Sequence, residues 1–395
     1  MDTGTAVTAQ QNTSSVMEIR HILHIIRCGL MVIYVVLNNL YTIPSYLLWC
    51  WLFLFPIRVV HPNFYWYLEG KLLKWMLCSV ASWSWWAKYY IVEIGEDITP
   101  CLEQRCLILV NHQSTSDVPL LMTAFENKTG VLEGVLWIMD HLFRYTNFGL
   151  VSSTRGDFFI TQGKNVRSSQ LKSLEDHLFN VYMPRTRQWL VLFPEGGFLR
   201  KRRETSQKYA EKNNYPFLQH VTLPRVGAMY TIINSLRPGK VEENLKQRRN
   251  SDILNKKQKE PLRWVIDITI GYPDGGKPLD LPTICSSYRP SCTTYFHYRC
   301  YPIDDVPEDM ESMKQWLYDR WVEKEHLLDE YYKTGKFPHK SIRGDSNSNN
   351  YKLMSQPTKV IFSDFYIAFC HLFYVVSSFL HYYILGHMWQ FVYTF

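Results

Sequence analysis

The sequence predicts an α/β fold, with a largely parallel sheet flanked by helices and with membrane helices at its N- and C-terminal ends. Within residues 95–335, apolar runs of strand length alternate with longer helical patterns, an order typical of β-α-β units. Residues 28–57 contain no Asp, Glu, Lys or Arg, and neither do residues 365–395. Each of these two runs exceeds the ~20 apolar residues that cross a bilayer core as a helix.

The N-terminal part divides into a polar tail, 1–20, and membrane and interfacial helices, 21–94. The apolar run 28–57 is longer than one span needs and contains Pro44. It therefore predicts either one tilted, kinked span or a helix pair that enters the bilayer and turns back. Tryptophans and lysines alternate over 64–92, which predicts an amphipathic helix in the membrane interface. The alternative is an ordinary amphipathic core helix.

The α/β domain is expected over 95–335, followed by a linker and a second membrane segment. Residues 238–262, which include QRRN and NKKQKE, are predicted to be a charged insertion. Residues 336–360, which include SIRGDSNSNNYK, are predicted to be a flexible linker. Residues 361–395 are expected to form one membrane helix or a hairpin that turns back near Gly386. The apolar runs are RCLILV, FGLVSS, QWLVLF, VTLPRVGAMY and WVIDITIGY, and the helical patterns are VPLLMTAF and SQLKSLEDHLF.

Composition restricts the classes of function. The chain has 43 Lys and Arg against 36 Asp and Glu, a formal net charge of +7, which suits anionic partners such as phosphates or lipid head groups. There is no repeated basic-aromatic pattern, zinc finger or recognition helix, so nucleic acid is not an expected partner. The nine cysteines are scattered without zinc-site spacing, which predicts reduced thiols and no metal site.

The stretch LILVNHQSTSDVPLL, residues 107–121, contains the first candidate for chemistry. Its apolar run predicts a buried strand, and a helical pattern follows, so His112 and Asp117 lie at a strand-to-helix turn. In open parallel sheets, ligands bind beyond the carboxyl ends of the strands. The Asp117 carboxylate can hold one nitrogen of the imidazole and leave the other as a proton acceptor. The alternative is a helix cap beside a structural histidine.

The second candidate is FPEGG, within WLVLFPEGGFLRKRRETS. A predicted strand leads to Glu195, whose carboxylate suits a substrate that bears a hydroxyl group. Gly196 and Gly197 allow a ligand to approach the backbone closely. A basic run begins at Arg200, and guanidinium groups suit phosphate. The alternative for this basic run is a solvated face or a membrane-surface patch.

Two further arginines follow apolar segments. Arg155 ends GLVSSTR, which we interpret as a short strand and its exit, and Arg225 ends VTLPR. Either guanidinium could hold a phosphate group, and the alternative for each is a surface ion pair. The sequence contains no G-x-S-x-G, P-loop or H-E-x-x-H motif, so it does not support a serine hydrolase, a kinase or a zincin.

These segments, in this order, resemble the four sequence blocks of the glycerolipid acyltransferase family. NHQSTSD is similar to the first block, GLVSSTR to the second, FPEGG to the third and VTLPR, more loosely, to the fourth. The resemblance places His112 and Asp117 at the catalytic pair of the family. It places Arg155, Glu195 and Gly196 at positions that bind the acceptor.

One departure from the family pattern concerns the phosphate contact. Many members have Thr-Arg after FPEG, whereas this chain has Gly197 and Phe198. The resemblance then implies that the contact with phosphate moves to Arg200 or its neighbours. The segments MDHLFRYTNFG, GDFFITQGK and WVEKEHLL are similar to members that acylate lysophosphatidylglycerol or lysophosphatidylethanolamine.

The resemblance implies a membrane enzyme of the endoplasmic reticulum, and because acyl-CoA is made in the cytosol, we expect the α/β domain to face the cytosol. It would transfer an acyl group from acyl-CoA to the free hydroxyl of a lysophospholipid, with acyl-CoA as co-substrate and no other cofactor. One alternative is an acyltransferase for another acceptor, such as lysophosphatidic acid or lysocardiolipin. Another is a membrane protein that binds lipid without catalysis. The acceptor head group stays open at this point.

Overall fold

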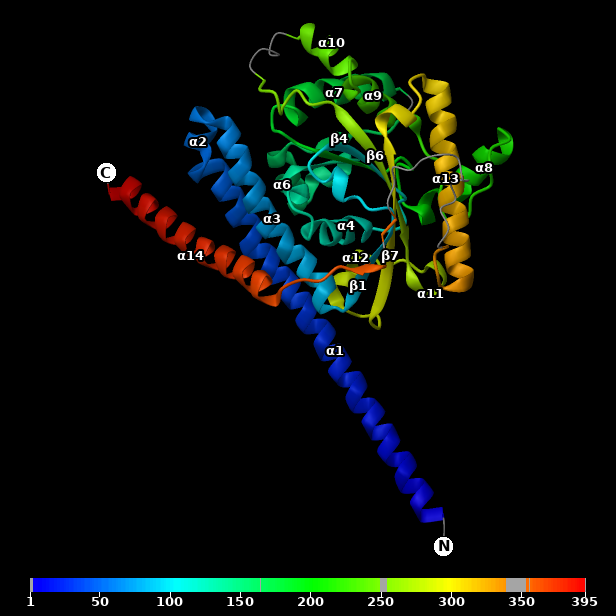
Figure 1. Ribbon diagram of the computed structural model, residues 1–395. Coiled ribbons are helices and arrows are strands. Elements are labelled where there is room, and N and C mark those ends of the chain that lie inside the picture. The colour runs from blue at the N-terminus through cyan, green and yellow to red at the C-terminus, as the bar shows by residue number, and fades with distance from the viewer. Residues whose placement is uncertain (1–2, 164, 249–253, 339–352, 355, 395) are drawn as a thin grey trace.

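The computed structural model describes residues 3–163, 165–248, 254–338, 353–354 and 356–394. Within these ranges the chain forms an eight-stranded sheet in the order β4-β3-β5-β2-β6-β7-β1-β8. Helices cover both faces of the sheet, and two long helices extend away from it (Figure 1). The strands are β1 (Tyr89–Gly95), β2 (Arg105–Val110), β3 (Val135–Asp140), β4 (Phe158–Ile160), β5 (Trp189–Leu192), β6 (Leu262–Gly271), β7 (Cys292–Pro302) and β8 (Thr358–Lys359).

The largely parallel sheet predicted from the sequence is confirmed. The strands β4, β3, β5, β2 and β6 are parallel to their neighbours, as β7 is to β1. The pairs β6–β7 and β1–β8 are antiparallel. The carboxyl ends of the five consecutive parallel strands, from β4 to β6 in the sheet order, therefore share one edge, which is where α/β proteins place their ligands.

The structure differs from the sequence prediction at two places that matter for function. VTLPRVGAMY, predicted to be a strand, is a loop that runs into helix α9 (Val226–Leu236). FGLVSS, predicted to be a strand, lies in helix α6 (Asn147–Arg155). Thr146 caps this helix by accepting a hydrogen bond from the Gly149 N–H, and Gly156 ends it in the left-handed conformation (φ +87°). The other helices are α1 (Thr3–Leu48), α2 (Phe55–Val60), α3 (Pro62–Trp86), α4 (Asp117–Glu126), α5 (Val131–Gly134), α7 (Arg167–His177), α8 (Leu199–Lys212), α9 (Val226–Leu236), α10 (Lys240–Lys246), α11 (Pro273–Gly276), α12 (Leu281–Ser286), α13 (Met310–Thr334) and α14 (Asp364–Thr394).

Two hydrophobic cores lie on opposite faces of the sheet. Ile108 and Val110 of β2 belong to the core shared with α1, α3, α4 and α14. Leu107 and Leu109 belong to the core shared with α7, α9 and α13. Because β2 is buried on both faces, its sequence is an unbroken apolar run and does not alternate with polar residues.

The terminal helices are long, apolar and largely exposed. Met17–Phe53 and Asp364–Phe391 are each long and apolar enough to cross a membrane, and only 11% and 28% of their most apolar stretches are buried. Figure 1 shows α1 and α14 extending from the body of the molecule. These properties indicate a membrane protein. The helix α1 runs through Pro44, and α14 continues past Gly386, so the structure has one helix where a C-terminal hairpin was the alternative.

The predicted interfacial helix over 64–92 is a core element. Helix α3 buries more than half of its residues and packs between α4 and the two terminal helices. Trp83 is 3% exposed and donates a hydrogen bond to Asn38 (3.1 Å). The alternative, an amphipathic core helix, is what the structure shows.

The segments expected to be tail, insertion and linker are partly ordered. The predicted tail is helical from Thr3, and the charged insertion contains α10, whose Val241 and Leu245 are buried. The end of the predicted linker forms β8 against β1. The polar run SIRGDSNSNNYK and residues 249–253 lie outside the described residues. None of the nine cysteines forms a disulfide bond.

Candidate active site

The site is built on the carboxyl ends of β2 and β5, which are neighbours in the sheet. Asn111 follows β2 and exchanges two hydrogen bonds with the backbone of Ile270 in β6 (3.1 and 2.8 Å). These bonds fix the exit of β2, so that the next residue, His112, is held at the edge where ligands bind. The strand β5 leads to Glu195 at the same edge.

His112 and Asp117 meet, as predicted from their spacing. The Nδ1 atom of His112 lies 2.8 Å from Oδ2 of Asp117, which is fully buried. The same oxygen accepts the backbone N–H groups of Gln113 (2.7 Å) and Ser114 (3.0 Å), and Tyr272 donates its hydroxyl to Oδ1 (2.5 Å). These donors fix the position of the Asp117 carboxylate. It orients the Nδ1–H tautomer of the imidazole, which leaves Nε2 as a proton acceptor.

Two aromatic rings fix the plane of the imidazole. Phe193 stacks on His112 with ring centroids 4.1 Å apart, and Phe198 packs against it at 4.4 Å. The His112 side chain is 14% exposed. Its ring is therefore sheltered by apolar groups while the site remains open to a ligand.

The Glu195 side chain connects the turn that carries His112 with the loop before α9, which contains Thr222. One oxygen accepts the His112 N–H (3.0 Å) and the Trp321 indole N–H (3.3 Å). The other accepts the backbone N–H (3.0 Å) and the hydroxyl (2.8 Å) of Thr222. Burial raises the pKa of Glu195 to about 7, against the hydrogen bonds from Thr222 and His112, which lower it. Protein groups therefore contact both oxygens of the carboxylate that was predicted to contact the acceptor.

The two glycines after Glu195 allow a close approach of side chains. Gly196 adopts φ +67°, and a side chain there would meet Arg225 at 3.3 Å. A side chain at Gly197 would lie 2.7 Å from Nε of Arg202. The lack of side chains at these two positions is therefore what brings Arg202 and Arg225 against the loop.

Arg202 and Arg225 converge on one neutral acceptor. The Oε1 atom of Gln162 accepts hydrogen bonds from Arg202 (2.6 Å) and Arg225 (3.0 Å), and its Nε2 donates to the Gly196 carbonyl (2.7 Å). Partial burial, and then the charges of Arg202 and Arg167, lower the pKa of Arg225. Neither Arg202 nor Arg225 forms an ion pair with a carboxylate in the described part of the chain. Two neighbouring guanidinium groups that form no ion pair with the described residues suit a phosphate group.

The structure places Arg155 away from this edge. Arg155 is 1% exposed, and its guanidinium donates to Glu69 (3.2 Å) and to the carbonyl of Val135 (2.6 and 2.9 Å). Val135 begins β3, so Arg155 lies at the amino ends of the strands while His112 lies at the carboxyl ends. The expectation that Arg155 leaves a strand was wrong, and its guanidinium is engaged within the protein. Arg200 is exposed and forms no hydrogen bond or ion pair with the other described residues.

Helix α13 supplies site residues that the sequence had not revealed. Trp321 donates to Glu195, as given above, and Glu325 accepts the backbone N–H groups of residues 219–221 (2.8, 2.8 and 3.2 Å). These two side chains are four positions apart, so they share one face of the helix. Lys324 anchors α13 to the sheet through Asp267 (2.5 Å) and the Ile268 carbonyl (2.6 Å). The motif WVEKEHLL was noted in the sequence, but it gave no sign of these roles.

Known proteins are similar to this chain over most of its length. Residues 91–226 match the family model for Acyltransferase, and residues 287–361 match that for Acyltransferase C-terminus. The chain is 48% identical over 311 residues to acyl-CoA:lysophosphatidylglycerol acyltransferase 1 of Homo sapiens, covering 77% of this chain and 81% of that protein. It belongs to the acyltransferase family.

Two other relatives show the breadth of this similarity. The acyltransferase is 30% identical over 311 residues to a putative 1-acyl-sn-glycerol-3-phosphate acyltransferase, acl-12, of Caenorhabditis elegans, covering 76% of this chain and 75% of that protein. The crystal structure of the 1-acyl-sn-glycerophosphate acyltransferase PlsC from Thermotoga maritima covers 74% of this chain and 97% of its own, at 11% identity and a TM-score of 0.34. The C-terminal family match includes α13, the helix that contacts Glu195.

Proposed function

We propose that this acyltransferase moves a fatty acyl group from acyl-CoA to the free hydroxyl of a lysophospholipid. The observation that carries the proposal is the contact of 2.8 Å between Nδ1 of His112 and the buried carboxylate of Asp117. This contact leaves Nε2 as a base at the carboxyl edge of the sheet. The name of the human relative supports lysophosphatidylglycerol as an acceptor, and lysophosphatidylethanolamine is the second acceptor that we include.

The reaction needs one base and a fixed acceptor. The Nε2 atom of His112 removes the proton from the lysophospholipid hydroxyl, and the oxygen attacks the thioester carbonyl of acyl-CoA. The carbon–sulfur bond then breaks, and CoA leaves as a thiolate that regains a proton from the imidazolium. Asp117 stabilises that imidazolium while the reaction proceeds. A positioned base of this kind contributes roughly 10²–10⁴-fold to the rate.

The acceptor phosphate is assigned to Arg202 and Arg225, together with the glycines that let them approach. This assignment replaces the phosphate contacts expected at Arg155 and Arg200. The two guanidiniums bracket Gln162, and they flank the loop that follows Glu195, whose carboxylate accepts the His112 N–H. A phosphate bound there holds the glycerol end of the lipid near the base, which lowers the entropic cost of the attack.

We place the enzyme in the endoplasmic reticulum membrane with the α/β domain on the cytosolic side. Acyl-CoA is water-soluble at its nucleotide end, whereas a lysophospholipid lies in the bilayer. An acyltransferase domain attached to two candidate spans can meet both substrates at the bilayer surface. Selective permeabilisation of cells followed by proteolysis would test the orientation, because a cytosolic domain is cleaved when only the plasma membrane is opened.

Acyl transfer itself is tested with labelled acyl-CoA and lysophosphatidylglycerol in membranes that contain the protein. We expect His112→Ala to abolish both product formation and CoA release, with the melting temperature unchanged. His326→Ala is the matched control, since His326 is exposed on α13. A folded His112→Ala enzyme with undiminished turnover would refute the proposal. Lipid binding by the wild type without CoA release would indicate a binding protein instead.

A further inference from the structure

A cavity of about 290 Å³ lies at the carboxyl ends of β3 and β4. Its walls come from the 3₁₀ helix η3 (His141–Tyr145), from β4 and the residue after it, and from α7. Ligand pockets for drug-sized molecules span roughly 300–1,000 Å³, so this volume suits a small group and not a whole lipid or a nucleotide. The polar residues that line it are His141, Arg144, Tyr145, Thr161, Gln170 and Ser173.

The cavity adjoins the proposed phosphate site through two chain segments. Thr161, in its wall, directly precedes Gln162, which holds Arg202 and Arg225. Gln170, in the opposite wall, lies on α7, whose first residue is Arg167. The positive charge of Arg167 helps to lower the pKa of Arg225. A group attached to the far side of a bound phosphate would therefore enter this cavity.

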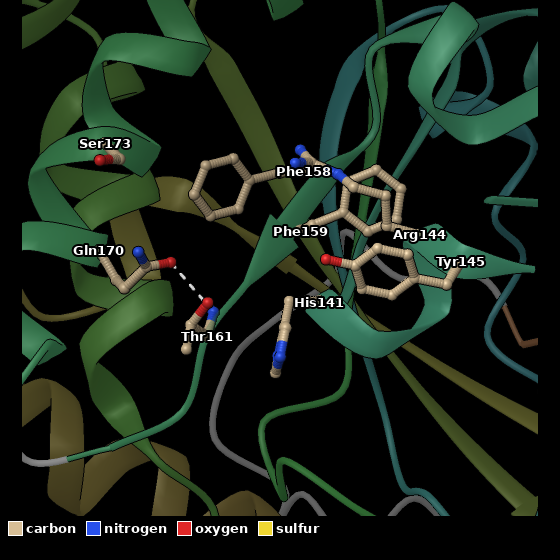
Figure 2. Close-up of a pocket in the computed structure, with 8 residues that line it drawn as sticks. All are labelled: His141, Arg144, Tyr145, Phe158, Phe159, Thr161, Gln170 and Ser173. Atoms are coloured by element: carbon tan, nitrogen blue, oxygen red, sulfur yellow. Dashed lines mark hydrogen bonds between the residues drawn. The ribbon is translucent and has the colours of Figure 1, made fainter. Parts of the chain in front are cut away.

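The lining suits an uncharged group with several hydroxyls. The backbone N–H of Thr161 donates a hydrogen bond to Oε1 of Gln170 (3.0 Å). Figure 2 shows the Tyr145 hydroxyl facing this pair. The Ser173 hydroxyl can both donate and accept a hydrogen bond, and the side-chain NH2 group of Gln170 can donate. Vicinal hydroxyl groups can both donate to and accept from such a set.

The lining does not suit an ammonium group. No carboxylate lines the cavity. The carboxylate of Asp140, the residue before His141, accepts the Leu142 N–H (3.0 Å) and the Gln162 Nε2–H (3.2 Å) and lies 3.3 Å from Nδ1 of His141. The Arg144 guanidinium lies 4.8 Å from the ring centroid of Phe159 and covers one face of that ring. This guanidinium also lines the cavity, and its positive charge repels an ammonium group.

We propose that this cavity binds the glycerol head group of the acceptor, so that the enzyme prefers lysophosphatidylglycerol to lysophosphatidylethanolamine. The inference rests on the proposed function, since it names the part of the same acceptor that lies beyond the phosphate. It assigns specificity to Gln170 and Arg144, which neither touch the reacting atoms nor belong to the proposed phosphate contacts.

The test compares kcat/KM of the full-length enzyme for lysophosphatidylglycerol, lysophosphatidylethanolamine and lysophosphatidic acid, which has no head group. Gln170→Glu keeps the oxygen that accepts the Thr161 N–H and adds a negative charge inside the cavity. We expect it to raise the ethanolamine-to-glycerol ratio about tenfold, because a carboxylate pairs with an ammonium group. Activity on lysophosphatidic acid should change by less than about twofold, since that acceptor leaves the cavity empty.

Ser168→Asp is the matched control, because Ser168 is exposed on the first turn of α7 and does not line the cavity. It adds the same charge to the same helix, and the acceptor ratio should stay at the wild-type value. Arg144→Gln is a second variant on an exposed residue, should Gln170→Glu fail to fold. It frees the face of Phe159, so the ethanolamine-to-glycerol ratio should rise here as well.

The outcomes separate this inference from the proposed function. A wild type that acylates none of the three lipids refutes the function. A wild type that is active but prefers the ethanolamine lipid refutes the inference alone, as does an unchanged ratio in both Gln170→Glu and Arg144→Gln. A change in KM for acyl-CoA with no change in the acceptor ratio would place part of CoA in the cavity and would also overturn the inference.

Discussion

At the scale of single residues, Asp117 determines the orientation and the tautomer of the His112 imidazole. Its two oxygens receive hydrogen bonds from an imidazole, two backbone amides and the Tyr272 hydroxyl. The amides and the hydroxyl hold the carboxylate whether or not His112 is protonated. The Asp117 side chain therefore needs no rearrangement when the imidazolium forms, which is the condition for electrostatic stabilisation without reorganisation.

Because of Glu195, we expect the free energy of unfolding to fall as the pH rises from about 4.5 to about 7. Burial raises its pKa from 4.5 to about 7, so between these values the folded protein holds a proton that the unfolded chain releases. The unfolding free energy therefore falls as pH rises across this window, by up to ~3 kcal/mol. Glu195→Gln cannot titrate, and we expect its melting temperature to fall less than that of the wild type between pH 5 and pH 7.5.

Tryptophan fluorescence would measure both melting curves. Because other groups titrate as well, the informative quantity is the difference between wild type and variant at each pH. Glu211→Gln, at an exposed position on α8, is the control and should follow the wild type. Parallel curves for Glu195→Gln and the wild type would mean that Glu195 does not titrate in this range.

The sequence predicted some site residues and missed others for a physical reason. His112 and Asp117 were found because both lie in one strand-to-helix turn, where local spacing carries the signal. Tyr272 donates to Asp117 from 155 positions away, and Gln162 meets Arg202 across 40 positions. Such pairs are created by the order of strands in the sheet, and no local pattern reports them.

At the scale of elements, α13 acts as a brace for the loop that leads to Thr222 and Arg225. Glu325 binds three consecutive backbone amides of this loop. Glu325→Gln replaces one acceptor oxygen by a donor that faces an N–H group, which costs about 1–3 kcal/mol locally. We expect the loop to loosen, so that KM for the lysophospholipid rises several-fold while kcat falls less.

Steady-state kinetics with varied lysophospholipid would measure this effect. The control is Glu330→Gln, because Glu330 is exposed on the same helix. If kcat and kcat/KM fell by the same factor while KM stayed unchanged, α13 would act on the base and not on the acceptor loop.

Arg155 shows how one wrong element changes the function given to a residue. It was expected to leave a strand and bind the acceptor, but α6 carries it to a buried cluster with Glu69 and Arg187. We expect Arg155→Lys to lower the melting temperature, because lysine cannot keep the guanidinium contacts with Glu69 and Val135. The loss should be about 1–3 kcal/mol, with KM for the acceptor unchanged in the folded enzyme.

Thermal unfolding and acceptor kinetics together decide the role of Arg155. Arg200→Lys is the control for stability, since Arg200 is exposed and should leave the melting temperature unaltered. An Arg155→Lys enzyme that melts like the wild type but has a raised KM for the acceptor would restore the role that the family resemblance implies.

At the scale of the whole molecule, the C-terminal helix is attached to the catalytic domain at its start. The strand β8 pairs with β1, Asn127 donates to the Ile361 carbonyl (2.7 Å), and Trp85 donates to Asp364 (3.1 Å). The sequence predicted membrane segments at both ends. It left one helix or a hairpin open at the C-terminus, and the structure has the single helix α14 there.

A polar cluster joins the helices α1, α3 and α14 beside the domain. His371 of α14 accepts or donates hydrogen bonds with Tyr41 (2.5 Å) and Tyr34 (2.9 Å) of α1, and Tyr34 also contacts Ser82 of α3 (2.6 Å). Polar side chains between apolar helices hold them together where lipid offers no alternative partner. This cluster therefore fixes the two candidate spans relative to each other.

His371→Ala should weaken the assembly of the three helices without touching the chemistry. Two tyrosine hydroxyls lose a partner, which costs about 1–3 kcal/mol in a buried setting. We expect a lower melting temperature in detergent and faster proteolysis between α14 and the domain, with kcat in native membranes close to that of the wild type. His387→Ala, at an exposed position on the same helix, should behave like the wild type. If the two alanine variants melt alike, the packing of α14 depends on its apolar contacts and the polar cluster is dispensable.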